Sequence, residues 1–242
     1  MLSDYNCRIF DISKFDILSC DLNDTFSVEL EKSKQDIALM AKNGFHKFYC
    51  PVRHNEYNSV LHTKRNIRKL KKLYHKAIPR DCGKINVNFV PKIFLSCNAP
   101  YINNISSLAI KGTKYVFVEL PLDFNVDYVP EALNKLLYSC NLIPIFTEFQ
   151  LYVSFYDDNE VEKMLRIKNA AFQFNIKHVS APQNIRAIKK IIKNGNIVLL
   201  GTNCSHELLN VNEIKKYIEK FKRTIGEQTF LDIVLSSKRF LS

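Results

Sequence analysis

Two glutamates occupy positions where functional residues are common in α/β proteins, at the ends of short apolar runs that favour β-strands. Glu119 lies at the end of the run 115–120, and Glu148 follows the run 142–146. Residues 129–138 between them have apolar side chains at helical spacing, so the stretch is typical of a βαβ unit. Such a unit has parallel strands and a right-handed crossover, and polar residues at the carboxyl ends of its strands gather at one edge. We therefore expect both carboxylates at that edge, where alone they would hold at most one divalent metal weakly.

The histidines and cysteines lack the spacing of a recognisable catalytic or metal site. The six histidines form no HxH or HxxxH pair, and the two candidates among them are His54 and His206, which both follow predicted strands. The seven cysteines are odd in number, form no CxxC pair and lack the arginine-ended anion loop of a thiol phosphatase, which favours reduced, buried thiols in a cytoplasmic protein. No glycine-rich phosphate loop and no GxSxG elbow occurs in the sequence.

The run 64–76, KRNIRKLKKLYHK, predicts a basic surface helix with an apolar stripe at Ile67, Leu70 and Leu73. Its cations form a solvated face that is a candidate for binding an anion or an acidic partner. The formal net charge of +11 also favours anionic partners. Nucleic acid is the less favoured partner, because Tyr74 is the run's only aromatic residue. The candidate binding residues are Lys64, Arg65, Arg68, Lys69, Lys71 and Lys72.

The elements that must position these residues alternate between strand and helix along the chain, which predicts a parallel α/β fold. Closure into a distorted barrel is one solution. No apolar run reaches the ~18 residues of a membrane span, the N-terminus does not read as a secretory signal, and no linker interrupts residues 1–242, so we expect one domain. The further strands are predicted at 15–20, 45–52, 85–95, 170–176 and 196–200, and the further helices at 27–42, 58–76, 161–169, 183–193, 212–222 and 226–236.

Three segments carry a family resemblance: VFVELP followed by LYSCNLIPIFTEFQLY, then AAFQFNIKHVS, and KNGNIVLLGTNCSHE. They are similar to strands of the PHP-type bacterial tyrosine phosphatases, the CpsB/YwqE-like family of the polymerase and histidinol phosphatase superfamily, found with capsule and exopolysaccharide genes. The resemblance extends over residues 16–236. It implies a single-domain, distorted (β/α)7 TIM-like barrel, manganese-dependent phosphoric monoester hydrolysis, and a tendency to form homo-oligomers.

Most positions that the family uses for metal ligands hold other residue types in this chain. Glu119 is retained, but the first His-x-His falls on Leu18 and Cys20, and a strand-end glutamate falls on Lys92. Glu148 replaces a histidine, and Leu151 replaces the arginine near it. The positions of the family site are Leu18, Cys20, Asp24, Arg53 or, with a one-residue slip, His54, and then Lys92, Glu119, Glu148, Asn203, Ser205 and His206.

These replacements lead to the hypothesis of a degenerate, non-catalytic PHP-like protein without a metal cofactor. Lys92 or Arg53 would pair with Glu119 or Glu148, so that an ion pair replaces the metal cluster. The partner implied by the resemblance is the tail of a tyrosine kinase or another acidic or phosphorylated protein. The first alternative is an active manganese-dependent phosphatase with ligands from Asp24, His54, Glu119, Glu148 and His206. The second alternative is a basic barrel that binds nucleic acid.

Overall fold

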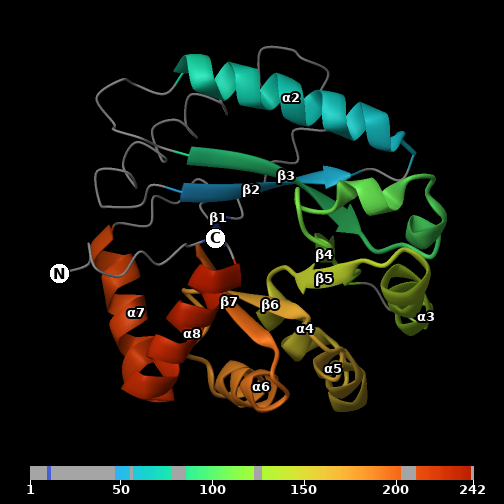
Figure 1. Ribbon diagram of the computed structural model, residues 1–242. Coiled ribbons are helices and arrows are strands. Elements are labelled where there is room, and N and C mark those ends of the chain that lie inside the picture. The colour runs from blue at the N-terminus through green and yellow to red at the C-terminus, as the bar shows by residue number, and fades with distance from the viewer. Residues whose placement is uncertain are drawn as a thin grey trace.

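A computed structural model describes residues 10–11, 47–54, 57–77, 86–122, 127–202 and 211–240 of the chain. Its centre is a seven-stranded sheet in the order β1-β7-β6-β5-β4-β3-β2, and every paired strand is parallel to its neighbour (Figure 1). The strands are β1 (Phe10–Asp11), β2 (Lys47–His54), β3 (Asn86–Phe94), β4 (Tyr115–Glu119), β5 (Ile143–Phe146), β6 (Ala171–Asn175) and β7 (Ile197–Thr202).

The parallel α/β class is confirmed, but closure of the sheet into a barrel is not. Strand β1 pairs with β7, and Cα atoms of β1 and β2 come within 8 Å, yet no ladder pairs these two strands in the described part of the chain. The predicted first strand, 15–20, and the predicted helix 27–42 lie outside the described residues. Strand β1 instead comprises Phe10–Asp11, which the sequence pattern did not predict.

Helices connect the strands and cover the outer side of the sheet. Figure 1 shows α2 along β2 and β3 at the top of the molecule, with α6, α7 and α8 at the opposite side. The helices are α2 (Val60–Ala77), α3 (Val129–Asn134), α4 (Phe149–Phe155), α5 (Asp158–Leu165), α6 (Pro182–Lys193), α7 (Val211–Ile225) and α8 (Glu227–Phe240). Short turns are η2 (Ala99–Tyr101), η3 (Ile105–Leu108) and the π-helical turn η4 (Lys135–Ser139) that extends α3. None of the helices in the described part of the chain has the length and apolar character of a transmembrane segment.

Helix α4 was not predicted, and α5 begins earlier than the predicted segment 161–169. The start of α5 has a clear physical cause, because Asp157 and Glu160 form a capping box. The Glu160 N–H donates to the Asp157 carboxylate at 2.8 Å, and the Asp157 N–H donates to Glu160 Oε2 at 3.3 Å. These bonds satisfy two backbone donors that a helix start leaves without intrahelical partners.

The two faces of the sheet have separate apolar clusters. The inner cluster contains buried residues from six strands: Tyr49, Val90, Phe117, Ile145, Ala171 and Leu199. The larger outer cluster joins alternate strand residues such as Val118, Phe146 and Phe172 to Phe149 of α4 and the other helices. Because successive side chains of a strand point to opposite faces, the residues two or four positions beyond the inner cluster share its face. Arg53, Lys92, Glu119 and Gln173 therefore extend the inner face toward the carboxyl edge of the sheet.

Candidate functional site

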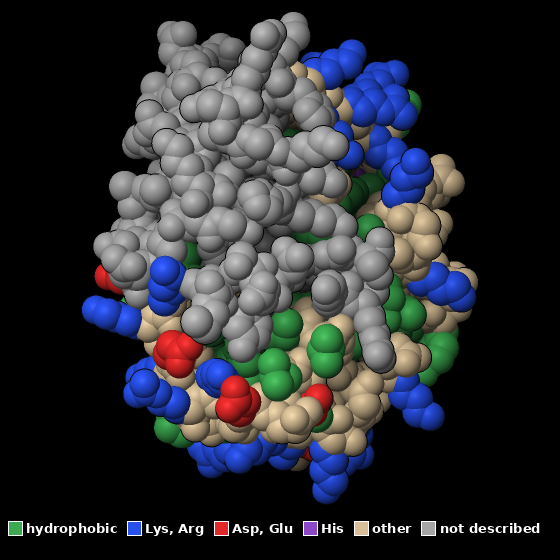
Figure 2. Space-filling view, turned by 60° about the vertical axis from the view of Figure 1, so that its left-hand side comes forward, with side chains coloured by type: hydrophobic (Ala, Val, Ile, Leu, Met, Phe, Trp, Pro, Cys, Tyr) green, Lys and Arg blue, Asp and Glu red, His purple; other side chains and the backbone are tan. Residues whose placement is uncertain are grey.

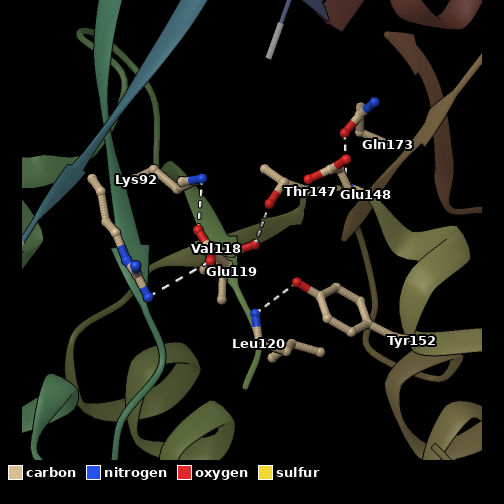
Figure 3. A network of polar contacts seen from close by, with 9 residues as sticks. Lys92, Val118, Glu119, Leu120, Thr147, Glu148, Tyr152 and Gln173 are labelled. Atoms are coloured by element: carbon tan, nitrogen blue, oxygen red, sulfur yellow. Dashed lines mark hydrogen bonds and ion pairs between the residues drawn. The ribbon is translucent and has the colours of Figure 1, made fainter. Parts of the chain in front are cut away.

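Three charged side chains meet at the carboxyl edge of β2, β3 and β4. Arg53 pairs in register with Lys92, and Glu119 pairs with Phe94 on the next ladder. The Lys92 Nζ lies 2.6 Å from Glu119 Oε2, and Arg53 Nη2 lies 3.6 Å from Glu119 Oε1 (Figure 3). The predicted ion pair between a strand-end cation and Glu119 is therefore present. Each carboxylate oxygen of Glu119 faces a cation.

Burial and packing favour this arrangement. The Lys92 side chain is 13% exposed and that of Glu119 is 28% exposed, so water screens their attraction less than it would at the open surface. The Arg53 side chain is 38% exposed, and its guanidinium carbon lies 4.5 Å from the centre of the Phe94 ring. A cation over an aromatic face is attracted by the ring's electrons, which helps to hold the guanidinium beside Glu119.

The residues that follow β5 are tied to β4 and β6 by hydrogen bonds. Both the N–H and the hydroxyl of Thr147 donate to the Val118 carbonyl, at 3.0 and 3.2 Å. Glu148 has left-handed backbone angles, φ 50° and ψ 43°, which a non-glycine residue adopts only when its surroundings hold it there. The Glu148 N–H donates to Gln173 Oε1 at 2.7 Å, and Gln173 is 1% exposed (Figure 3).

Gln173 and Thr147 are members of this edge that the sequence analysis missed. A buried amide in the apolar run AFQFN of β6 was the available signal, because a buried polar side chain needs a hydrogen-bond partner. Gln150 of α4 has a matching role, since its Oε1 accepts the N–H of Asn175 at 3.0 Å. These bonds connect the β5 edge to β6 through side chains rather than through the strand ladder.

Tyr152 of α4 lies under the same edge. Its hydroxyl accepts the N–H of Leu120 at 2.9 Å, directly after Glu119 (Figure 3). Burial raises the pKa of Tyr152 well above its ordinary range, and the negative charges of Glu119 and Glu148 raise that pKa further. The phenol therefore remains protonated at neutral pH, and its oxygen supports the strand end by accepting this hydrogen bond.

His54 lies on the opposite face of β2 from Arg53. Its Nδ1 is 2.7 Å from the Thr63 hydroxyl of α2, and the residue is 2% exposed. Burial lowers the pKa of His54, so the ring is neutral at pH 7. Among the described residues, its Nε2 has no hydrogen-bond partner. Arg53, rather than His54, is therefore the residue of this strand end that meets Glu119.

Several predicted site positions fall outside the described residues. These are Leu18, Cys20, Asp24, Asn203, Ser205 and His206. Leu151, at the position of the family's arginine, is 40% exposed on α4. The six predicted cations all lie on helix α2, and none of them belongs to the ion-paired cluster around Glu119.

The described residues at this edge do not fit a divalent metal cluster. A metal would need the Glu119 carboxylate, but both of its oxygens already face the positive charges of Lys92 and Arg53. Within the described ranges no three His, Cys, Asp or Glu side chains gather in a way that could hold a metal ion. The donor set instead suits a carboxylate that is neutralised by protein cations.

The fold and this strand edge define a parallel α/β protein with a cluster of charged side chains at the carboxyl edge of its sheet. The family model described as "Capsular polysaccharide synthesis, CpsB/CapC" matches residues 20–241. The chain therefore belongs to the CpsB/CapC family of capsular polysaccharide synthesis proteins. No curated protein matches it significantly.

Two solved structures share its fold at low sequence identity. One comes from the work on YwqE from Bacillus subtilis and CpsB from Streptococcus pneumoniae, described as unique metal-dependent tyrosine phosphatases. It has a TM-score of 0.61 and 13% identity, over 86% of this chain and 85% of the other. The second is histidinol phosphate phosphatase from Lactococcus lactis subsp. lactis, complexed with zinc, L-histidinol and phosphate. It has a TM-score of 0.51 and 12% identity, over 90% of this chain and 94% of the other. At these identities the likeness establishes the fold and not the activity.

Proposed function

We propose that this chain is a non-catalytic member of the CpsB/CapC family, in which protein cations replace the metal cluster of a tyrosine phosphatase. The observation that carries the proposal is the 2.6 Å contact between Lys92 Nζ and Glu119 Oε2. A divalent cation that approached Glu119 would have to displace Lys92 and would also be repelled by Arg53. By the family resemblance, Lys92 falls at the position of a strand-end glutamate that serves as a metal ligand. The lysine therefore puts a positive charge where the family has a ligand for the metal.

The retained edge is proposed to bind a partner rather than to hydrolyse a phosphate ester. Arg53 is 38% exposed, so its guanidinium can donate hydrogen bonds to an anionic group while it stays near Glu119. The net charge of +11 favours encounter with an acidic or phosphorylated protein segment. Within a capsule-synthesis system we propose the tail of a tyrosine kinase as that segment. We also propose that this chain is cytoplasmic. Its sheet is proposed to close, through β1 and β2, into a single-domain barrel.

Metal content and hydrolysis separate this proposal from an active phosphatase. Protein purified without chelators is analysed for manganese, iron and zinc, and then assayed with p-nitrophenyl phosphate and with a phosphotyrosine peptide plus manganese. We expect less than one metal per chain and no turnover above a blank. Turnover that disappears in Glu119→Ala but persists in Glu131→Ala would overturn the proposal. Glu131 is the matched control, because it is an exposed carboxylate that pairs with a lysine, Lys135, at 2.6 Å.

That outcome would favour the metal-dependent alternative, whose candidate ligands are Asp24, His54, Glu119, Glu148 and His206. His54 is the weakest of them, since its ring packs against Thr63 on the helix side of β2. The observation that favours the alternative is the retained Glu119 at the end of β4, with a second carboxylate, Glu148, just after the neighbouring strand β5. The Glu119 variant tests it directly.

Binding of a phosphotyrosine peptide tests the partner role. We expect Arg53→Gln to weaken binding by on the order of tenfold, because a hydrogen bond to a charged group is lost. The control is Arg166→Gln, which removes an exposed arginine that likewise lies beside a glutamate, Glu162, at 3.9 Å. Equal affinity of wild type and Arg53→Gln, or equal losses in both variants, would contradict binding at the strand edge.

A further inference from the structure

Helix α2 has a composition that the strand-edge site does not explain. Seven of its 18 residues are Lys or Arg and none is Asp or Glu. The cations are Lys64, Arg65, Arg68, Lys69, Lys71, Lys72 and Lys76. A helix gains from acids in its first turn and from mixed charges along its surface, and α2 has neither. The charge pattern therefore weakens the helix itself and needs another explanation.

The packing of α2 directs one row of these cations away from the protein. Among its described side chains, the buried ones are Val60, Thr63, Ile67 and Leu70, at 6, 1, 7 and 6% exposure, and they face β2 and β3. At 3.6 residues per turn, the opposite side of the helix carries four exposed cations. We call these four, Arg65, Arg68, Lys69 and Lys72, the basic face of α2.

No acid in the described part of the chain forms an ion pair with the basic face. In Figure 2 lysine and arginine side chains gather along the upper right edge of the described surface, and the acidic side chains lie lower on the molecule, among further lysines and arginines. Helix α2 occupies that upper edge in Figure 1. The cations repel one another unless something other than the described residues neutralises them.

Two exposed apolar side chains lie at the N-terminal end of this face. Leu61 is 53% exposed in the first turn of α2, and Tyr57 is 89% exposed just before the helix. Leu61 lies one turn before Arg65, on the same side of the helix. Leucine and aromatic residues beside a row of cations are typical of helices that lie on a lipid interface.

We infer that the basic face of α2, together with Leu61 and Tyr57, adsorbs to an anionic lipid surface. Clusters of four to eight Lys or Arg on a helix attract acidic headgroups by about 1 kcal/mol for each cation near the surface, which corresponds to about fivefold in binding. A lipid surface needs no matching pattern of hydrogen bonds, so it suits cations spread along one convex helix. Single-stranded nucleic acid is a poorer fit, because base stacking needs aromatic residues among the cations and Tyr57 lies only at the end.

Adsorption through the basic face would also position the strand-edge site relative to the lipid surface. Helix α2 starts at Val60, shortly after β2 ends at His54, so its N-terminal end adjoins the carboxyl edge of the sheet (Figure 1). Adsorption through α2 would place Arg53, Lys92 and Glu119 near the plane of the membrane. The inference does not depend on whether that edge binds a partner or hydrolyses a phosphate ester.

Vesicle flotation with the full chain tests the inference. One set of vesicles contains phosphatidylcholine alone, and the other contains equimolar phosphatidylcholine and phosphatidylglycerol. We expect binding to the anionic vesicles only, with a steep loss of binding as salt is added. Absence of binding to the anionic vesicles at low salt overturns the inference.

Two triple variants with the same change of net charge locate the contact. Arg65→Gln, Arg68→Gln and Lys72→Gln together remove three cations of the basic face, and should weaken binding by on the order of a hundredfold at about fivefold each. The control, Arg186→Gln, Lys189→Gln and Lys193→Gln, removes three exposed cations of α6 on the far side of the molecule (Figure 1). Binding should fall far less in the control. If the two triple variants lost the same amount of binding to anionic vesicles, the effect would be one of non-specific charge, and the inference would be overturned.

A third variant separates lipid from other anionic partners. Leu61→Ser should remove most of the binding that remains at high salt, because that residual binding depends on apolar contact. The same variants are measured with a single-stranded DNA oligonucleotide and with polyglutamate. If either polymer binds through the basic face while anionic vesicles do not, the face belongs to nucleic acid or to an acidic protein, and the lipid inference is wrong.

Discussion

At the scale of single residues, the strand-edge site shows how one position along a strand decides which side chain reaches it. The sequence allowed either Arg53 or His54 to occupy the family position, and the two point to opposite faces of β2. Arg53 meets Glu119, whereas His54 meets Thr63 of α2. A shift of one residue reverses every side chain of a strand, and no motif near His54 fixed that register. The Lys92–Glu119 contact was one of the predicted pairings, because both residues lie near the carboxyl ends of adjacent strands.

Replacement of Lys92 should destabilise the fold. Lys92→Gln leaves the Glu119 carboxylate with Arg53 at 3.6 Å as its remaining ionic partner at this edge among the described residues. Loss of a hydrogen bond to a charged group that is 28% exposed should lower the free energy of unfolding by about 1–3 kcal/mol, as measured by urea denaturation. In the double variant with Glu119→Gln, the loss should be smaller than the sum of the two single losses. Strict additivity would mean that the contact contributes nothing to stability.

Burial of His54 should make stability depend on pH. Burial lowers the pKa of His54 from its ordinary value of 6.5, so the unfolded chain binds a proton at this residue before the folded chain does. The contribution of neutral His54 to the free energy of unfolding is therefore complete above pH 6.5. It declines as the pH falls below that value toward the lower pKa of the folded state.

The measurement is urea unfolding of wild type and His54→Gln at a series of pH values between neutral and mildly acidic. The substitution should flatten the dependence below pH 6.5. His178→Gln is the control, because His178 is an exposed histidine in the turn after β6, and its profile should follow that of wild type. A wild-type profile that is unchanged by His54→Gln would contradict the buried, neutral assignment.

At the scale of elements, the boundaries of strands and helices were predictable where apolar periodicity and end signals agreed. Strands β4 to β7 and helix α6 lie within two residues of their predicted bounds. Helix α4 was missed, because residues 149–155 follow β5 with almost no connection and contain aromatic residues that favour strands as well. The structure assigns them to a helix, since Phe149 and Tyr152 pack on the outer face of the sheet. Tertiary packing, not local preference, decided this element.

The capping box of α5 gives a prediction at this scale. Asp157→Ala removes the oxygen that accepts the Glu160 N–H, and should lower the free energy of unfolding by about 1 kcal/mol. Asp158→Ala is the matched control, because it removes a neighbouring exposed acid that is not the capping residue. It should lose only the smaller favourable interaction with the helix dipole. The comparison is made by urea denaturation, and equal losses in both variants would remove the capping box as the cause.

At the scale of the whole molecule, the alternation of strands and helices predicted the parallel sheet but could not establish its closure. Open and closed parallel sheets share the same alternating pattern, and the difference depends on how the first strand meets the second in space. Strand β1 contains two residues, and the predicted strand 15–20 lies outside the described part of the chain. The proposed degeneracy of the site rests on positions in β2, β3 and β4 that the structure describes. It also rests on positions such as Leu18 and Asn203, which lie outside the described residues.

The helical layers at the two ends of the sheet offer a test of the expected single domain. Ile67 of α2 is 7% exposed, in the layer over β2 and β3. Phe230 of α8 is 3% exposed, in the layer near β7, and its ring centre lies 6.0 Å from that of Phe221. Cavity formation should cost about 2–5 kcal/mol for Ile67→Ala and about 3–5 kcal/mol for Phe230→Ala. If the layers unfold together, each variant should shift the whole urea transition, and circular dichroism and tyrosine fluorescence should report the same midpoint. The chain has 11 tyrosines and no tryptophan, so tyrosine is the fluorescent probe.

Leu235→Ala is the control, because Leu235 is 53% exposed on α8, and it should change the free energy of unfolding little. Two separate transitions, each sensitive to one variant only, would show that the layers belong to different folding units.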